Sequence, residues 1–151
     1  MRFLLYDRIT HLEKGRCIRG VKGFSLSEEF LRNHYGKIAL VPGAMMIEAM
    51  AQLLGWLIIY SNDFSLSAVM SLLEEVTVTS TLRPGFQAEI YGEIVSMSRR
   101  DSLGLARMSV DGRTVASMDR IIYSHVHQVD PEELARLFRY YSGLPSGRMP
   151  Q

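Results

Sequence analysis

The sequence contains a single cysteine, Cys17, and almost no net charge over its 151 residues. One cysteine excludes an internal disulfide framework and favours a reducing compartment. The 17 basic and 16 acidic residues give a net charge of +1, and the basic residues are scattered, so nothing indicates a nucleic-acid or anionic-membrane partner. The N-terminus reaches a charge, Asp7, too soon for a signal peptide. These absences favour a cytoplasmic protein.

Long apolar runs are also scarce, and the longest spans residues 44–59. That run has about 16 residues and contains Glu48, whereas a bilayer-crossing helix needs roughly 20 apolar residues. We therefore expect no membrane-spanning helix. The composition, 47% hydrophobic and 22% charged, is ordinary for a globular protein. We expect one domain over residues 1–143 and a disordered tail over residues 144–151, which contain two prolines.

The longest apolar run predicts a helix from Pro42, which suits the first helical position, to about Tyr60. Residues 44–59 are apolar or small apart from Glu48 and Gln52. Because these two residues are four apart, they lie on one face of a helix. A carboxylate among apolar side chains is unfavourable unless it is paired or kept neutral. Glu48 is therefore a candidate acid or base.

The remaining elements are mostly strands separated by turns. We predict a strand at residues 12–24, a helical turn at 25–31, and further strands at 67–73, 76–82, 86–97, 103–110 and 114–126. Asp111 and Gly112 are typical of a two-residue hairpin turn. A capping box at Asp130 opens a C-terminal helix over residues 130–142. Because an apolar helix needs cover, we expect an α+β domain in which a curved antiparallel sheet wraps one long central helix.

The segment around the predicted helix resembles the signature of a known family. It reads His34-Tyr35-Gly36, a spacer, and then Pro42-Gly43-Ala44-Met45-Met46-Ile47-Glu48-Ala49-Met50-Ala51-Gln52. This closely resembles the β-hydroxyacyl-acyl-carrier-protein dehydratases of hotdog fold, whose motif runs His-Phe-Pro, a spacer, Pro-Gly and Ile-Glu-Ala-Met-Ala-Gln. The histidine-to-glutamate spacing is the same. The chain departs from the family at Gly36 and at residues 37–39, where the family has prolines.

The resemblance implies a catalytic constellation. Dehydration of a β-hydroxyacyl thioester requires a base, an acid for the leaving hydroxyl and a group that polarises the thioester oxygen. In the resembled family the position of His34 is the base and that of Glu48 is the acid. The backbone N–H at Gly43 polarises the thioester, and the carbonyl at Leu40 orients the imidazole. Gln52 is expected to line the site, and neither a metal nor a cofactor is expected.

The resemblance also implies the partners. The substrate would be a β-hydroxyacyl chain carried on the phosphopantetheine of acyl carrier protein. The product would be a trans-2-enoyl thioester in fatty-acid or related lipid or polyketide synthesis. The family forms each active site between two subunits, so we expect a homodimer or a trimer of such dimers. His34 and Glu48 of one site would then come from different chains.

Two other functions stay open at this point. A hotdog acyl thioesterase would use a carboxylate and a water on the same thioester and would not require His34. A non-catalytic hotdog subunit would bind acyl chains or pair with an active partner. His125 and His127 alternate on one strand face, but the sequence offers no evident third ligand, so we do not expect a metal there. Cys17 is expected to be a small core residue.

Overall fold

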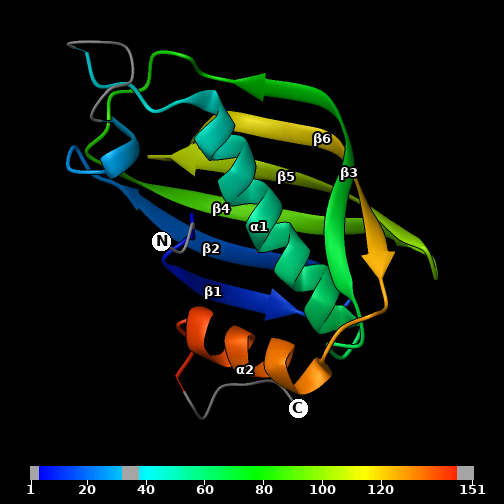
Figure 1. Cartoon of the computed structure of the whole chain (residues 1–151). Helices are drawn as coiled ribbons and strands as arrows, with labels where there is room; N and C mark the ends of the chain where they lie inside the picture. The colour runs from blue at the N-terminus through cyan, green and yellow to red at the C-terminus, as the bar shows by residue number, and fades with distance from the viewer. Residues whose placement is uncertain (1–3, 32–37, 146–151) are drawn as a thin grey trace.

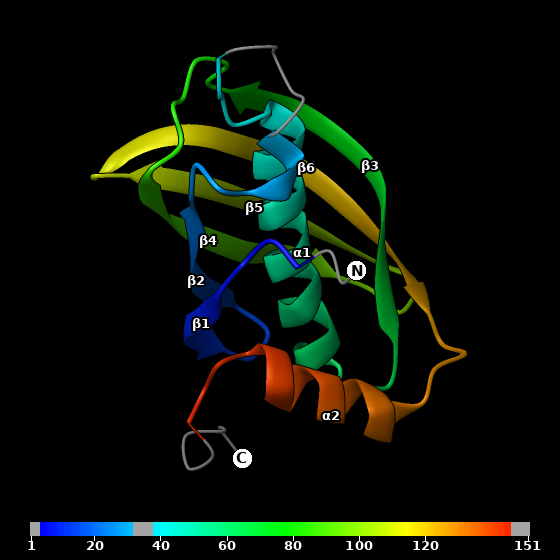
Figure 2. The same cartoon turned by 60° about the vertical axis from the view of Figure 1, so that its left-hand side comes forward.

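The computed structural model describes residues 4–31 and 38–145. Its strands form one antiparallel sheet in the order β1-β2-β4-β5-β6-β3 (Figure 1). The strands are β1 Arg8–Glu13, β2 Cys17–Phe24, β3 Ser67–Val78, β4 Phe86–Met97, β5 Asp101–Val110 and β6 Arg113–Val126. The helices are η1 Glu29–Leu31, α1 Gly43–Ser61 and α2 Pro131–Tyr141. The sheet curves around α1, with β3 and β1 at its two edges (Figure 2). The predicted hotdog fold is confirmed.

Helix α1 begins at Gly43, one residue after the predicted start, because Pro42 has an extended backbone and stands at the N-cap. With 19 residues and high hydropathy, α1 is long and apolar enough to suit a membrane span, so the length of the apolar run does not by itself exclude one. In the structure, 61% of that span is buried, because the concave face of the sheet covers it. The helix is therefore the core of the fold.

Three glycines let α1 approach the sheet closely. A side-chain carbon added at Gly20 of β2 would lie 3.0 Å from a methyl of Leu53, and one added at Gly104 of β5 would lie 2.8 Å from a methyl of Leu54. Leu54 also lies against Gly92 of β4, where the added carbon would be 3.4 Å away. The two leucines are fully buried in the hollows that these glycines leave. The glycines thus set the distance between helix and sheet.

Two predicted strand boundaries are wrong. The single strand expected at residues 12–24 is a hairpin, because Gly15 adopts a positive φ of 74° and turns the chain between β1 and β2. The two strands expected at 67–73 and 76–82 are one strand, β3, which ends at Val78. Pairing with β6 continues through this region, with Glu74 opposite Arg120, although Glu75 has a positive φ of 54°. Pairing with β6 therefore makes one strand across the break predicted at residues 74–75.

The second half of the chain follows its local signals closely. Asp111 and Gly112 have φ values of 50° and 76°, as a hairpin turn with two positive φ angles requires. The Asp130 side chain caps α2 by accepting from the N–H groups of Glu132 and Glu133. Phe138 of α2 packs against α1, with its ring centroid 5.5 Å from those of Trp56 and Tyr60. The tail predicted at 144–151 lies mostly outside the described residues.

Candidate active site

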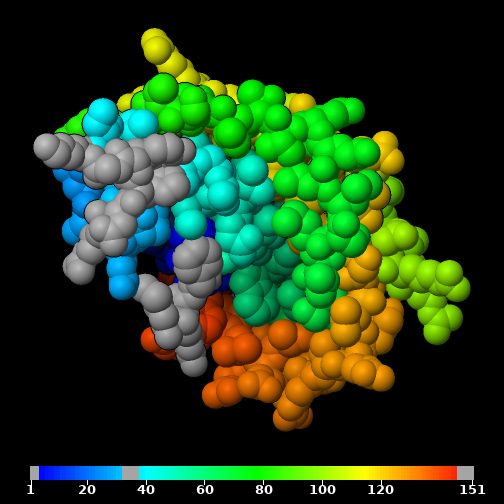
Figure 3. Space-filling view, turned by 45° about the horizontal axis from the view of Figure 1, so that its top comes forward, coloured from blue at the N-terminus to red at the C-terminus, as the bar shows by residue number. Residues whose placement is uncertain are grey.

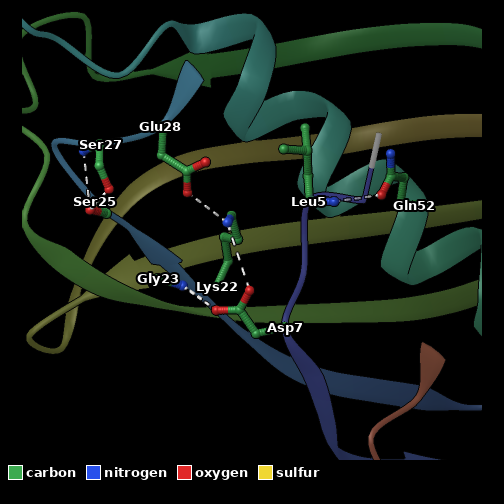
Figure 4. A network of polar contacts seen from close by, with 8 residues as sticks. All are labelled: Leu5, Asp7, Lys22, Gly23, Ser25, Ser27, Glu28 and Gln52. Atoms are coloured by element: carbon green, nitrogen blue, oxygen red, sulfur yellow. Dashed lines mark hydrogen bonds and ion pairs between the residues drawn. The ribbon is translucent and has the colours of Figure 1, made fainter. Parts of the chain in front are cut away.

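Glu48 and Gln52 form a hydrogen-bonded pair on one face of α1. The Gln52 side-chain amide donates to Oε1 of Glu48 over 2.9 Å. The amide oxygen of Gln52 accepts from the backbone N–H of Leu5 over 3.0 Å (Figure 4). Because a backbone N–H can only donate, Leu5 fixes the orientation of the amide and leaves its NH₂ group for the carboxylate. The N-terminal segment therefore positions Glu48 through Gln52.

An apolar groove extends along α1 from this pair. It has a volume of about 270 Å³ and is lined by Leu4, Glu48, Ala51, Gln52, Gly55, Trp56, Ile59, Ala68, Met70 and Tyr123. Its α1 residues run from Glu48 to Ile59, which is about 16 Å of helix at 1.5 Å per residue. Figure 3 shows part of the α1 surface (teal) uncovered beside β3 (green), with α2 (orange) below it. Glu48 and Gln52 thus lie at the N-terminal end of a groove long enough for an extended chain.

Tyr123 of β6 closes one side of the groove. Its hydroxyl donates to the backbone oxygen of Ala51 over 2.6 Å. Burial raises the pKa of Tyr123, and the negative charge of Glu48 raises it further. The phenol therefore stays protonated and holds α1 against the sheet. Sequence reasoning missed this residue, because it lies 72 positions from Ala51 and carries no local signal.

Gly43 lies at the N-terminus of α1, where the helix dipole is positive. A side-chain carbon added at this position would come within 2.8 Å of a methyl of Val78 in β3. A glycine is therefore required where the helix starts against the sheet edge. Leu40, half-buried, precedes Val41, whose N–H donates to the oxygen of Leu82 over 2.9 Å. The backbone that leads into α1 is thus anchored to the segment after β3.

His34 lies outside the described residues, so its expected partnership with Glu48 stays a prediction. The chain before it is held by an ion-pair network around the buried Lys22 (Figure 4). Lys22 is 7% exposed, and its ammonium group lies 2.9 Å from the Glu28 carboxylate and 3.7 Å from that of Asp7. Asp7 also accepts from the N–H of Gly23 over 2.6 Å. This network joins the N-terminal segment, β2 and the residues before η1.

His125 and His127, the histidines expected on one strand face, contact the backbone of the turn between β4 and β5. His125 and His127 lie with their ring centroids 6.3 Å apart, and a ring nitrogen of each is within 3.3 Å of the carbonyl oxygen of Arg99. The other ring nitrogen of His125 is 2.8 Å from the buried Ser102 hydroxyl. These contacts secure the turn between β4 and β5. Cys17 is buried, as expected of a core residue.

The sequence matches the family described as FabA-like domain over residues 1–119. Among curated proteins, it is 31% identical to the 3-hydroxyacyl-[acyl-carrier-protein] dehydratase FabZ of Oleidesulfovibrio alaskensis, over 78% of this chain and 78% of that protein. It is 30% identical to FabZ of Bacillus subtilis, over 78% of this chain and 84% of that one.

Solved structures of similar fold have lower sequence identity. The dehydratase heterocomplex ApeI:P of Xenorhabdus doucetiae aligns with a TM-score of 0.67 and 15% identity, over 89% of each chain. The hypothetical thioesterase of Streptococcus pneumoniae solved with coenzyme A aligns with a TM-score of 0.63 and 17% identity, over 82% of this chain and 90% of that one. These neighbours support the hotdog fold alone. The family match and the FabZ relatives together show that this chain belongs to the FabA-like family, within which its curated relatives are dehydratases.

Proposed function

We propose that this protein is a hydro-lyase that dehydrates β-hydroxyacyl thioesters carried on acyl carrier protein. The observation that carries the proposal is the Glu48 carboxylate, fixed by Gln52 at the end of an apolar groove. The FabZ relatives are named as 3-hydroxyacyl-[acyl-carrier-protein] dehydratases, which favours the same substrate class here. The product would be a trans-2-enoyl thioester for fatty-acid or related lipid synthesis in the cytoplasm.

In the proposed reaction, His34 removes the proton from the carbon next to the thioester carbonyl. Histidine suits this role because its side chain titrates near neutral pH. The carbon–carbon double bond forms as the β-hydroxyl leaves, and the Glu48 carboxyl protonates that hydroxyl so that it departs as water. The Gly43 N–H, aided by the α1 dipole, stabilises the negative charge on the thioester oxygen. The Leu40 carbonyl keeps the imidazole oriented.

The groove along α1 is the proposed site of the acyl chain. Apart from Glu48, Gln52 and Tyr123, its lining residues are apolar or small. Small residues on α1, Ala51 and Gly55, leave room for methylene groups beside the helix. An acyl chain in this groove would bring its β-carbon to the Glu48 end and leave the thioester near the N-terminus of α1.

A second copy of the chain is the proposed partner at β3. This edge strand has 12 residues, and four large apolar side chains on it are exposed, Val69, Met70, Leu72 and Val76. A long apolar edge strand with unpaired backbone groups is a template for strand pairing. Met70 also lines the groove, so a partner at β3 would lie beside the active site. We infer a homodimer in which His34 of one subunit serves Glu48 of the other, with a trimer of dimers as a possible higher assembly.

A direct assay tests the proposed reaction. The purified protein is incubated with a β-hydroxyacyl thioester of acyl carrier protein, and both enoyl absorbance and free thiol are followed. We expect enoyl product without thiol release. Release of thiol would establish the thioesterase alternative, and the absence of both products would favour a non-catalytic acyl-binding subunit.

Hybrid dimers test whether the site is shared. His34→Ala and Glu48→Ala proteins, each inactive alone, are mixed under conditions in which subunit exchange has been verified. Hybrid dimers contain one site with both catalytic residues intact, so part of the activity should return. Absence of recovery would place His34 and Glu48 of each site in the same chain.

A further inference from the structure

A cluster of metal-ligating side chains lies on the β1–β2 hairpin, away from the active site. His11, Glu13 and Cys17 each offer one ligand atom, and these atoms all lie within 4.8 Å of one another. His11 and Glu13 are two apart on β1 and therefore point to the same sheet face. Cys17 is the direct partner of Glu13 across the hairpin. The strand register thus brings one imidazole, one carboxylate and one thiol together.

The spacing between Cys17 and Glu13 fits tetrahedral zinc. Zinc binds thiolate at about 2.3 Å and carboxylate oxygen at about 2.0–2.2 Å, so at a tetrahedral angle the two ligand atoms are about 3.6 Å apart. The Sγ atom of Cys17 lies 3.7 Å from Oε2 of Glu13. A zinc ion could therefore bind these two atoms with almost no change in their separation.

The surroundings of the carboxylate leave one of its oxygens available to a metal. The guanidinium of Arg16 holds the other oxygen, Oε1 of Glu13, over 2.9 Å. This contact orients Oε2 toward Cys17, as partners of metal-ligating carboxylates commonly do. Cys17 is 8% exposed, whereas His11 is exposed, so a cation could enter from the histidine side.

The hairpin is separated from the proposed catalytic residues. Its turn contacts the C-terminal end of α1, where the N–H of Gly15 donates to the hydroxyl of Ser61 over 2.8 Å. Ser61 is 13 residues beyond Glu48 in the same helix, which corresponds to about 20 Å. A metal at the hairpin would therefore not take part in the reaction at Glu48.

We propose that His11, Glu13 and Cys17 form a binding site for a borderline-soft divalent cation of the zinc type. The ligand set is one imidazole nitrogen, Oε2 of Glu13 and the Cys17 thiolate, with water in the fourth position. The thiol releases its proton to solvent as the sulfur–metal bond forms. The bound ion joins β1 to β2 at the end of the sheet.

Cobalt(II), a spectroscopic substitute for zinc, tests the site on the full-length protein. Titration should produce a thiolate-to-cobalt charge-transfer band that saturates at one ion per chain and is reversed by zinc. Cys17→Ser should abolish the band, and His11→Ala should weaken cobalt binding at least about tenfold, since even partners of metal ligands contribute that much. His127→Ala is the matched control, because His127 is exposed and lies outside the cluster. It should bind cobalt like the unaltered protein.

Cys17 is buried, so the test is designed to give an answer even where the Cys17→Ser protein does not fold. His11 is exposed, so His11→Ala should retain the fold, which circular dichroism verifies. No charge-transfer band with the unaltered protein at millimolar cobalt would overturn the proposal. So would a band of unchanged affinity in His11→Ala. Neither result would bear on dehydration, which is assayed separately at Glu48.

Discussion

The two faces of α1 contrast sharply in their surroundings. One face is sealed against the sheet, where Leu53, Leu54 and Leu57 are fully buried. The other carries Glu48 and Gln52 and lines the groove. Both faces belong to one helix whose residues are almost all apolar, so composition alone does not distinguish them. The sheet packs against one face, and the groove on the other face is the proposed place for chemistry.

The largest effect is expected at the groove face, with Glu48→Gln. Glutamine keeps the size and much of the hydrogen bonding of the carboxyl group but cannot exchange a proton. Loss of a positioned acid or base typically reduces the rate about 100- to 10,000-fold. We expect a loss of this order in kcat for dehydration, with an unchanged urea midpoint. Near-normal turnover would show that Glu48 is not the acid.

The packed face should show the opposite pattern, with Leu54→Ala. Leu54 is fully buried between Gly92 and Gly104, so truncation leaves a cavity at the helix–sheet contact. Such substitutions reduce the free energy of unfolding by about 2–5 kcal/mol. Urea denaturation measures this loss, and the rate per folded molecule should hardly change. Ala44→Ser, on the exposed surface of the same helix, is the control and should change stability by less than about 0.5 kcal/mol. Equal losses in the two variants would contradict the division into faces.

Gln52→Leu separates positioning from packing on the groove face. The substitution removes the donor to Glu48 and the acceptor for the Leu5 N–H. Glu48 becomes negatively charged as it gives its proton to the leaving hydroxyl, and a hydrogen bond to a charged group contributes about 1.5–3 kcal/mol. Without the Gln52 donor, kcat should therefore fall about 10- to 100-fold. KM should change little, because the substrate chain contacts the apolar part of the groove. A change confined to KM would instead assign Gln52 to substrate binding.

The smallest effect is expected from Gly55→Val, which should alter the choice of chain length. A carbon added at Gly55 would contact Tyr123 at an ordinary 3.7 Å, so Gly55→Ala fits and is the control. The branched valine side chain would occupy the groove beyond that point. We expect kcat/KM for long-chain substrates to fall about tenfold, within the range for a few methylene groups, and that for short-chain substrates to stay unchanged. An equal fall for both lengths would place the acyl chain elsewhere.

Local sequence determined much of this protein. The apolar run predicted α1, the spacing of Glu48 and Gln52 placed them together, and the cap at Asp130 and the turn at Asp111 marked α2 and the last hairpin. These features depend on residues a few positions apart, whose geometry is fixed by the helix period, capping and turn chemistry. Family resemblance, rather than periodicity, assigned roles to His34 and Gly43.

Tertiary structure alone decided how the candidate site is enclosed. Tyr123 reaches Ala51 from β6, Met70 borders the groove from β3, and Leu5 orients Gln52 from the N-terminal segment. The pairing of Glu13 with Cys17 was also decided by the structure, because it depends on the turn at Gly15 that joins β1 to β2. None of these contacts follows from local propensity. They arise when a curved sheet and its register bring distant residues against one helix, and burial of the packed face of α1 is what selects that arrangement.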